Sequence, residues 1–383
     1  LIALISVALL ALSPFDVLFA QIARQYSLLT VATIASSFCI LRAMRLRNAS
    51  SWGVYAIVNA IGLYTHPFFS FSAIAHGVYL LLLQFELPHR LRVKTQAPST
   101  EHHLEVELLK PQNFFFKYVL ANIVSLLLYL PWILVLAGNY QRALSSTNWA
   151  AGGTDWFFNI RLWMLSFTAL FLDLDVGFDS VWTYVIRLPI LLVILAGIWA
   201  LCRQTRRQTW LFVWTAILVP FLMLVLPDLL LGGRRSSVSR YLISCFPGIQ
   251  LAVAYLLGSN LMRSPLARIP QIFWRSLLVG LFTCSIASCS VSAIADTWWS
   301  NVPSYFNAET ARLVNQRTKP LLIVDEGDDG TNLGDLISLS YLLQDKVTLE
   351  LLSKSGLPKL SEASSKTYSD LLIFRPSGRL RGY

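Results

Sequence analysis

Charged residues are scarce in this sequence. They make up 14% of its 383 residues, whereas soluble domains carry about 25%. Hydrophobic residues make up 55% of the chain. This composition excludes an ordinary soluble domain and predicts an all-α polytopic membrane protein.

The sequence also lacks the cysteine patterns of zinc sites and disulfide frameworks. No cysteine belongs to a C-x-x-C motif. The five cysteines lie in or beside apolar runs: Cys39, Cys202, Cys245, Cys284 and Cys289. The net charge of +10 is carried mainly by short loops between apolar runs, which is typical of orientation signals in membrane proteins. We therefore expect no nucleic-acid partner.

Hydropathy predicts eight complete membrane spans and the end of another. The partial span is Leu1–Leu12, which is too short to cross about 30 Å of hydrocarbon and follows no basic segment. Because the chain starts with Leu1 rather than Met, we expect further residues upstream. The complete spans are Ser27–Met44, Trp52–Tyr64, Phe68–Phe85, Phe114–Ala137, Val181–Cys202, Trp210–Leu226, Tyr241–Met262 and Trp274–Ala295.

Four basic loops alternate along these spans so that all lie on one side, which the positive-inside rule assigns to the cytoplasm. Their basic residues are Arg42, Arg45 and Arg47; Arg90, Arg92, Lys94, Lys110 and Lys117; Arg203, Arg206 and Arg207; and Arg263, Arg268 and Arg275. The opposite loops are mixed or acidic, and they bring Arg24, His66 and Arg240 to the extracytoplasmic face. We expect an integral protein of the plasma (inner) membrane.

Two segments outside the spans have their own character. Trp156–Phe171 is apolar and aromatic but short, which predicts either a helix in the membrane interface or an aromatic belt that anchors neighbouring spans. Residues 297–383 are polar and predict a small C-terminal extracytoplasmic α/β tail after a transmembrane bundle of residues 1–296. The expected strands are Leu321–Val324, Val347–Leu352 and Asp370–Phe374, with a helix at Leu333–Leu343. Asp325–Gly330 lacks EF-hand spacing and predicts a solvated turn.

The stretch Ser13–Leu29 places an arginine, Arg24, in a short polar break between two apolar runs. An ionisable side chain at the membrane is costly unless it has a partner or a task. The planar guanidinium suits a two-point grip on a phosphate. The stretch therefore favours a phosphate site near the membrane surface. The alternative is a snorkelling arginine at the interface.

Three short motifs lie at the extracytoplasmic ends of the expected spans. They are Ala20-Gln21-Ile22-Ala23-Arg24-Gln25-Tyr26-Ser27, Tyr64-Thr65-His66-Pro67-Phe68-Phe69, and Arg240-Tyr241-Leu242 followed by Pro247-Gly248. In order and spacing this set resembles the polytopic glycosyltransferases of the dolichyl-phosphate-mannose protein mannosyltransferase superfamily. That superfamily includes bacterial aminoarabinose transferases and rhizobial galacturonosyltransferases, and the chain is similar to its cyanobacterial branch in particular. The resemblance covers most of Leu1–Ala295.

The resemblance implies a membrane glycosyltransferase. Such an enzyme moves a sugar from a polyprenyl-phosphate donor to a glycan, lipid or protein acceptor at the outer membrane face. Its catalytic base is an aspartate in the first external loop, so we expect the base upstream of Leu1 and name no catalytic residue in this sequence. Ile22 stands where the superfamily often has a glutamate, so the match around Arg24 is incomplete. No cofactor or metal ligand is assigned, and a divalent cation stays an open alternative.

Transfer from a phosphodiester needs cations or donors for the charge that develops on the leaving phosphate. Arg24 and Arg240 are our candidates for binding the phosphate. Tyr26 and Tyr241 are candidates for donating a hydrogen bond to a phosphate or sugar oxygen. His66 is a candidate sugar ligand, with a capping role before the following proline as the alternative.

Gln21, Arg234 and Arg235 are further substrate-binding candidates. The two arginines follow two glycines in a loop that could move over a substrate or could simply be solvated. Asp173 and Asp175 are not interpreted as a glycosidase pair, because sequence gives no distance between them.

Two other classes of function are alternatives. One is a transporter of lipid-linked glycans, which would normally show internal repeats. The other is a non-catalytic glycolipid-binding membrane protein. An Asp-Glu pair in a first external loop would favour the transferase over both.

Overall fold

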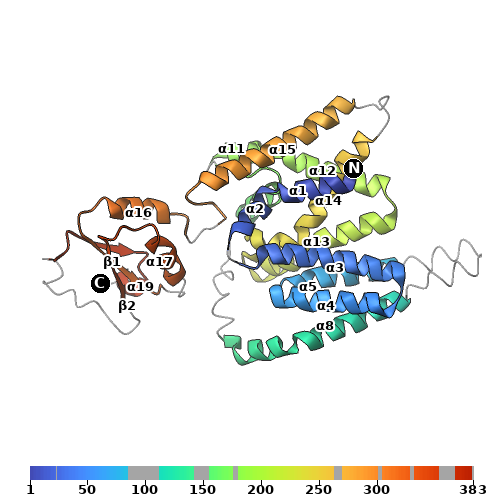
Figure 1. The fold of residues 1–383 in the computed structure, drawn as a ribbon, viewed down its shortest axis with the longest axis horizontal. Coiled ribbons are helices and arrows are strands. Elements are labelled where there is room, and N and C mark those ends of the chain that lie inside the picture. The colour runs from blue at the N-terminus through green and yellow to red at the C-terminus, as the bar shows by residue number, and fades with distance from the viewer. Residues whose placement is uncertain are drawn as a thin grey trace, which may run out of the picture. The chain divides into compact units, whose positions relative to one another are not determined.

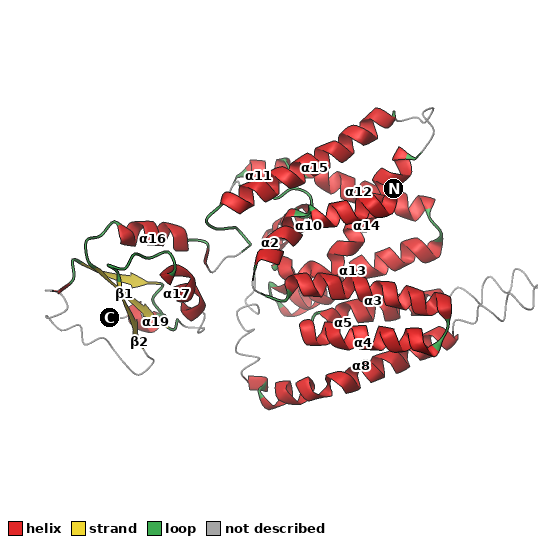
Figure 2. Cartoon of the chain, viewed as in Figure 1, coloured by secondary structure: helices red, strands yellow, loops and turns green. Residues whose placement is uncertain are grey.

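The computed structural model describes residues 1–22, 24–84, 112–141, 155–175, 180–262, 270–300, 304–327, 332–352 and 367–381. The chain divides into two compact units, residues 1–140 with 150–291 and residues 141–149 with 292–383. The first unit is helical, whereas the second contains a small parallel sheet (Figure 2).

The first unit is a bundle of long helices that lie side by side (Figure 1). Helix α3 packs on α4, α4 on α8, α13 on α5, and α14 on both α1 and α12. The α-helices are α1 (Ile2–Ala11), α2 (Pro14–Gln21), α3 (Tyr26–Leu46), α4 (Ala49–Thr65), α5 (Phe69–Gln84), α8 (Gln112–Gly138), α10 (Trp156–Thr168), α11 (Val181–Val185), α12 (Leu188–Gln204), α13 (Arg207–Leu231), α14 (Phe246–Leu261) and α15 (Gln271–Ile294). Two 3₁₀ helices, η2 (Arg235–Ser237) and η3 (Ser239–Cys245), lie between α13 and α14.

Among the described residues, six helices are long and apolar enough to cross a membrane, or seven if α1 and α2 form one span bent by 46°. This confirms a helical protein with several potential membrane spans. The sequence predicted eight complete spans, and the difference lies in α4 and α5, which have 17 and 16 residues. At 1.5 Å per residue, α4 extends about 26 Å, slightly less than a hydrocarbon core of about 30 Å.

Local signals begin α2 and turn the chain from α3 into α4. Ser13 Oγ accepts a hydrogen bond from the Asp16 N–H at the start of α2. Arg47 ends α3 with a φ of 59°, and Asn48 Oδ1 accepts a hydrogen bond from the Ser51 N–H at the start of α4. Such caps satisfy backbone groups that have no partner within a helix. They make these positions strong helix starts and so determine which segments share an end of the bundle.

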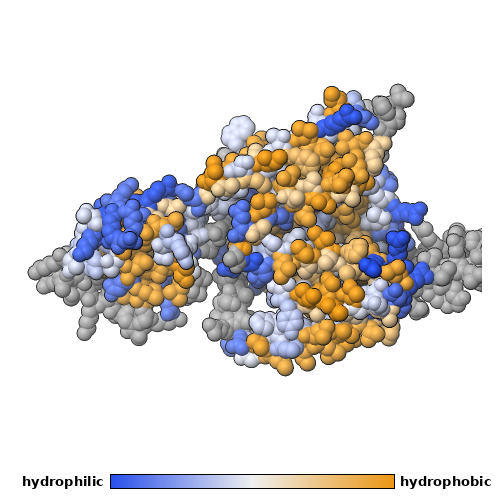
Figure 3. All heavy atoms as spheres, in the orientation of Figure 1, coloured by the Kyte–Doolittle hydropathy of each residue, from blue (hydrophilic) through white to orange (hydrophobic). Residues whose placement is uncertain are grey.

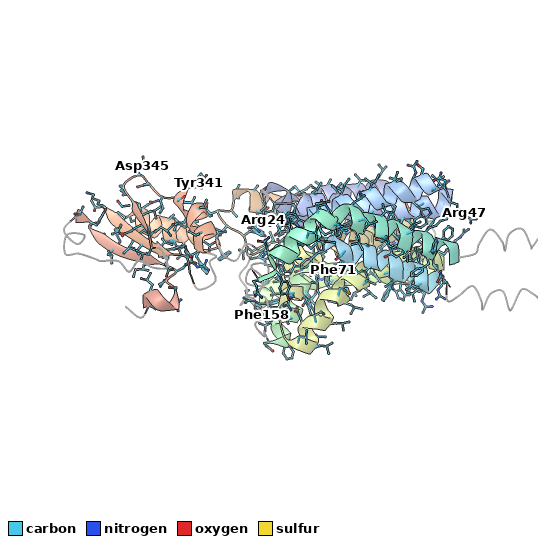
Figure 4. The ribbon with its side chains drawn as sticks, turned by 90° about the horizontal axis from the view of Figure 1, so that it is seen from below. Arg24, Arg47, Phe71, Phe158, Tyr341 and Asp345 are labelled. Atoms are coloured by element: carbon cyan, nitrogen blue, oxygen red, sulfur yellow. The ribbon has the colours of Figure 1, made fainter. Side chains whose placement is uncertain are left out.

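Two of the predicted basic loops meet at one end of the bundle. The Lys117 ammonium donates a hydrogen bond to the Arg47 carbonyl at 3.3 Å, which joins the first two basic loops. Arg47 and Arg24 lie toward opposite ends (Figure 4). Apolar residues cover the flanks of the bundle, and hydrophilic residues collect at its two ends (Figure 3). The predicted loop residues Arg90, Arg92, Lys94, Lys110, Arg263 and Arg268 lie outside the described residues.

A polar network lies inside the bundle, between α3, α4, α5 and α8. The ring nitrogens of buried His76 lie 3.2 Å from Ser37 Oγ and 3.1 Å from the Tyr55 hydroxyl. One helical turn away, Asn59 Nδ2 donates to Asn122 Oδ1 at 3.3 Å. Hydrogen bonds between membrane helices contribute about 1 kcal/mol each. The network therefore helps to hold the α3–α4 hairpin against α5 and α8.

The second unit contains a three-stranded parallel sheet of order β2-β1-β3. Its elements are α16 (Asn307–Asn315), β1 (Pro320–Asp325), α17 (Asn332–Ser340), β2 (Thr348–Leu352), β3 (Asp370–Phe374) and α19 (Gly378–Arg381). The three predicted strands and the helix between the first two are present, which confirms the α/β character. Helices α16 and α17 pack on one face of the sheet through an apolar core: Ala311, Val314, Leu322, Val324, Leu339 and Phe374.

The first residue of the predicted solvated turn, Asp325, is the last residue of β1 and has hydrogen-bond partners of its own. The Asp325 carboxylate accepts hydrogen bonds from the backbone N–H groups of Gly327 and Ser377 and from the Ser377 hydroxyl. Asp325 therefore ties the end of β1 to the segment that follows β3. Residues 328–330 of this predicted turn lie outside the described residues.

Candidate functional site

Three segments that are far apart in the sequence meet at the end of the bundle opposite the basic loops. Tyr26 is the first residue of α3, His66 is the C-cap of α4, and Tyr241 lies in η3. Consecutive ring contacts connect them through Phe68. The centroid distances are 6.3 Å from Tyr26 to His66, 5.0 Å from His66 to Phe68, and 4.6 Å from Phe68 to Tyr241. We call Tyr26, His66, Phe68, Arg240 and Tyr241 the end cluster.

Arg240 gives the end cluster its positive charge. The Arg240 guanidinium lies 5.5 Å from the centroid of the Tyr241 ring, within the range of a cation–π contact. Its charge also lowers the pKa of His66, so it acts on the imidazole across the cluster. Two predicted ligands from different motifs, His66 and Arg240, are thus brought together.

The protonation state of His66 follows from its surroundings. Partial burial lowers the pKa of this imidazole, and the positive charge of Arg240 lowers it further. The ring is therefore neutral at pH 7. Nδ1 accepts a hydrogen bond from the Phe68 N–H at 3.1 Å, which assigns the remaining proton to Nε2. His66 thus has the predicted capping role and still offers one N–H donor.

Tyr26 is positioned by the packing of α2 on α3. Its ring lies 5.2 Å from the Phe19 ring, with an edge-to-face geometry, and Ser27 Oγ donates to the Phe19 carbonyl at 3.4 Å. Tyr26 is only 5% exposed. Packing is therefore its first role, and it supports the side of the cluster on which His66 lies.

Arg24 and Gln21 lie on the connection from α2 to α3, and both are exposed. The Arg24 N–H donates to the Ile22 carbonyl at 2.6 Å, which makes a tight turn two residues before Tyr26. The Arg24 guanidinium forms no hydrogen bond or ion pair with the residues that the structure describes. Arg24 is therefore next to the end cluster along the chain and open to an external anion.

The segment with Arg234 and Arg235 is anchored to the bundle through its neighbouring residues, although Arg234 itself is exposed. It leaves α13 through two glycines with positive φ, 73° at Gly232 and 146° at Gly233, which glycine adopts without strain. The Ser237 hydroxyl then donates a hydrogen bond to the buried Asn159 side chain of α10. This bond connects the arginine segment to α10.

The predicted span Trp210–Leu226 leaves Asp228 in the same loop, and this was wrong. Helix α13 continues to Leu231, so Asp228 lies in its last turn and is buried. Its Oδ2 accepts a hydrogen bond from the Ser236 N–H at 2.6 Å, and its Oδ1 lies 3.7 Å from Arg235 Nη1. Asp228 therefore ties the arginine segment to α13, as Asn159 ties it to α10.

Asp173 has a structural partner in the interior. Asp173 is buried and lies 3.2 Å from the guanidinium of Arg187, which is 1% exposed. Arg187 also donates to the carbonyls of Leu172 and Leu174. This ion pair fixes the segment after α10.

Sequence reasoning gave Phe68, Asn159 and Arg187 no role at this end of the molecule. Phe68 was part of the Tyr64–Phe69 motif but was given no role, and its ring contacts are visible only in three dimensions. An arginine within an expected apolar span was the available signal for Arg187. Asn159, within the apolar Trp156–Phe171 segment, was the corresponding signal for the bond to Ser237.

The end cluster combines a guanidinium, a neutral imidazole N–H donor and aromatic faces, with Arg24 and Gln21 on the adjacent turn. This set suits an anionic group joined to a sugar, because guanidinium groups bind phosphate oxygens and ring faces pack against sugar carbons. Within the described parts of the chain, no group of three or more His, Cys, Asp or Glu could hold a metal ion. Comparison with protein-family models and with curated proteins found no match to this chain.

Proposed function

We propose that this protein is a membrane glycosyltransferase that moves a sugar from a polyprenyl-phosphate carrier to a glycan, lipid or protein acceptor. The observation that carries the proposal is the end cluster. Its ring contacts and the effect of Arg240 on His66 bring together side chains from all three motifs. The order and spacing of those motifs, which resemble the dolichyl-phosphate-mannose protein mannosyltransferase superfamily, supply the reaction class.

In the proposed reaction, an acceptor hydroxyl oxygen attacks the anomeric carbon of the sugar. The bond from that carbon to the phosphate oxygen breaks, and the lipid phosphate leaves with the electron pair. A general base takes the proton of the hydroxyl. By the resemblance, this base is an aspartate upstream of Leu1.

The residues of the end cluster stabilise the leaving group in this proposal. Negative charge grows on the phosphate as the bond breaks, and donors that are already in place stabilise it most effectively. Arg24 and Arg240 supply positive charge. The Nε2–H of His66 donates to a sugar or phosphate oxygen without adding charge.

We assign the end cluster to the extracytoplasmic face of the plasma membrane. The support is the distribution of basic residues, since the loops at the other end of the bundle carry Arg42, Arg45, Arg47 and Lys117. Such loops remain cytoplasmic in most membrane proteins. The carrier lipid then reaches the cluster from the outer leaflet.

A transfer assay with the full-length protein in lipid vesicles tests the proposal. The donors are a panel of polyprenyl phosphates that carry different labelled sugars. We expect one donor to lose its sugar to an acceptor and to leave polyprenyl phosphate. Arg240→Ala should abolish this turnover, whereas Arg203→Ala, which removes an exposed arginine at the opposite end, should not.

Two other outcomes separate the alternative functions. Binding of donors through Arg240 without any transfer would indicate a non-catalytic glycolipid-binding protein. Movement of the intact donor across the vesicle membrane would indicate a transporter. Either result would contradict the proposed transferase.

A further inference from the structure

The arginine segment carries its own internal anion. Asp228 is 7% exposed and lies near the end of α13. One carboxylate oxygen accepts the Ser236 N–H at 2.6 Å. The other lies 3.7 Å from Arg235 Nη1 and has no hydrogen-bond partner among the described residues. Arg235, which lies on the same segment as Arg240, is therefore already paired with the Asp228 carboxylate.

The two members of this pair differ in their freedom to move. The Asp228 side chain is 2% exposed, whereas the Arg235 side chain is 36% exposed. The carboxylate is confined by α13 and by its bond to Ser236, but the guanidinium reaches the surface. At 3.7 Å the contact is a loose ion pair and not a short charge-assisted hydrogen bond. Arg235 can therefore turn to another anion, whereas Asp228 cannot follow it.

Arg235 lies five residues before Arg240. It is part of η2, which contacts and directly precedes η3, the helix that contains Arg240. The segment is also held by the bond between Ser237 and Asn159, which involves no charge. Neutralising Asp228 should thus release Arg235 without releasing the whole segment.

We propose that Asp228 lowers the affinity of the end cluster for a lipid phosphate by holding Arg235 as an internal ion pair. This inference rests on the proposed function, since it takes the ligand of the cluster to be a phosphate. A transferase of this kind must let the polyprenyl phosphate product leave. A buried carboxylate that withholds one arginine weakens product binding while Arg24 and Arg240 remain in place.

The test compares variants that differ in charge at nearly constant shape. Asp228→Asn keeps an oxygen that can accept the Ser236 N–H, but it removes the negative charge. We expect it to bind a polyprenyl monophosphate about threefold to fivefold more tightly, because a partly exposed ion pair is worth up to about that factor. Binding is measured by titration of the protein in phosphatidylcholine nanodiscs, followed by tryptophan fluorescence.

Three controls isolate the ion pair. Asp155→Asn removes an equal charge from the exposed N-cap of α10 and should leave the affinity unchanged. Asp228→Asn combined with Arg235→Gln makes both members neutral and should return the affinity to that of the parent. A polyprenol without phosphate should bind all variants equally, which excludes an effect on the lipid chain.

The outcomes separate this inference from the proposed function. If the parent protein binds no polyprenyl phosphate, both are overturned. If the parent binds it and Asp228→Asn binds no more tightly, Asp228 is only an anchor and this inference alone is wrong. Should Asp228→Asn fail to fold, Arg235→Gln alone decides. The proposal expects parental affinity there, because Asp228 already withholds this arginine, and a loss of tenfold or more would overturn it by making Arg235 a phosphate ligand in the parent.

Discussion

Arg24→Ala is the most informative single substitution in this protein. Arg24 is exposed, and among the described residues its guanidinium has no hydrogen bond or ion pair. Replacing a surface side chain without such contacts changes stability by less than about 0.5 kcal/mol. A loss of activity in this variant would therefore report on the substrate and not on the fold.

The expected loss of activity is large. Removing one donor that is in place for a developing negative charge typically lowers the rate about 10²-fold to 10³-fold. This corresponds to about 3–4 kcal/mol of transition-state stabilisation. Arg24→Lys keeps the charge but loses the planar pair of donors, so we expect only partial recovery.

The assay is sugar transfer by the full-length protein in vesicles, with thermal unfolding of each variant measured in the same lipid. Arg47→Ala is the control, because Arg47 is an exposed arginine that flanks α3 at its other end. If Arg24→Ala folds normally and transfers sugar at the parental rate, Arg24 is an interface anchor. The phosphate role of this turn would then be wrong.

Three further predictions concern other parts of the chain. Arg187→Leu should lower the free energy of unfolding by about 3–5 kcal/mol, because it leaves the buried Asp173 without its counter-ion. The measurement is denaturation in detergent micelles, and a decrease of less than about 1 kcal/mol would contradict the prediction. Because its pKa is lowered, His66 should stay mainly neutral at pH 6.5, where an unperturbed imidazole is half protonated, so phosphate binding near this pH should follow the same profile in the parent and in His66→Gln. Because its pKa is lowered in the folded state, the parent should lose stability relative to that variant as the pH falls below about 6.5. Single cysteines within Arg42–Ser50 and within Thr310–Tyr383 should be labelled from opposite sides of the membrane, and labelling of both from one side would overturn the topology.

The helices were predictable because hydropathy and caps are local properties of the sequence. Strand β3, at Asp370–Phe374, has the predicted bounds. Helix α13 was predicted to end at Leu226 but continues to Leu231. Backbone hydrogen bonds extend a helix beyond its apolar part, and a window of hydropathy does not detect this. The early predicted end placed Asp228 in a loop, although it lies in the helix, and so its role was not predicted.

The candidate site was predictable only in part. Alternation of the loops was enough to place His66 and Arg240 at one end, because in a series of antiparallel helices every second loop lies on the same side. The ring contacts of Phe68 with His66 and Tyr241 depend on side-chain packing between α4, α5 and η3, for which the sequence has no local pattern. The ion pair of Asp173 with Arg187 has the same origin, since the two residues meet across the break between α10 and α12.

Among the described residues, the cations at the site end are all arginines, namely Arg24, Arg161, Arg187, Arg234, Arg235 and Arg240. Arginine also predominates at the opposite end, where Lys117 is the single described lysine of the first unit. Composition therefore does not distinguish the two ends, and the contacts of individual arginines show where the planar geometry of the guanidinium matters.

That geometry has two separate uses here. Arg187 needs several donors in a plane to satisfy one carboxylate and two carbonyls in the interior, and lysine could not supply them in this arrangement. Arg240, in contrast, acts on the half-buried His66 at the surface of the cluster. Burial therefore distinguishes arginines that hold the fold from arginines that serve a ligand. Arg235, half-exposed and paired with a buried carboxylate, lies between the two classes, which is why its release by Asp228→Asn should be measurable as a gain in binding.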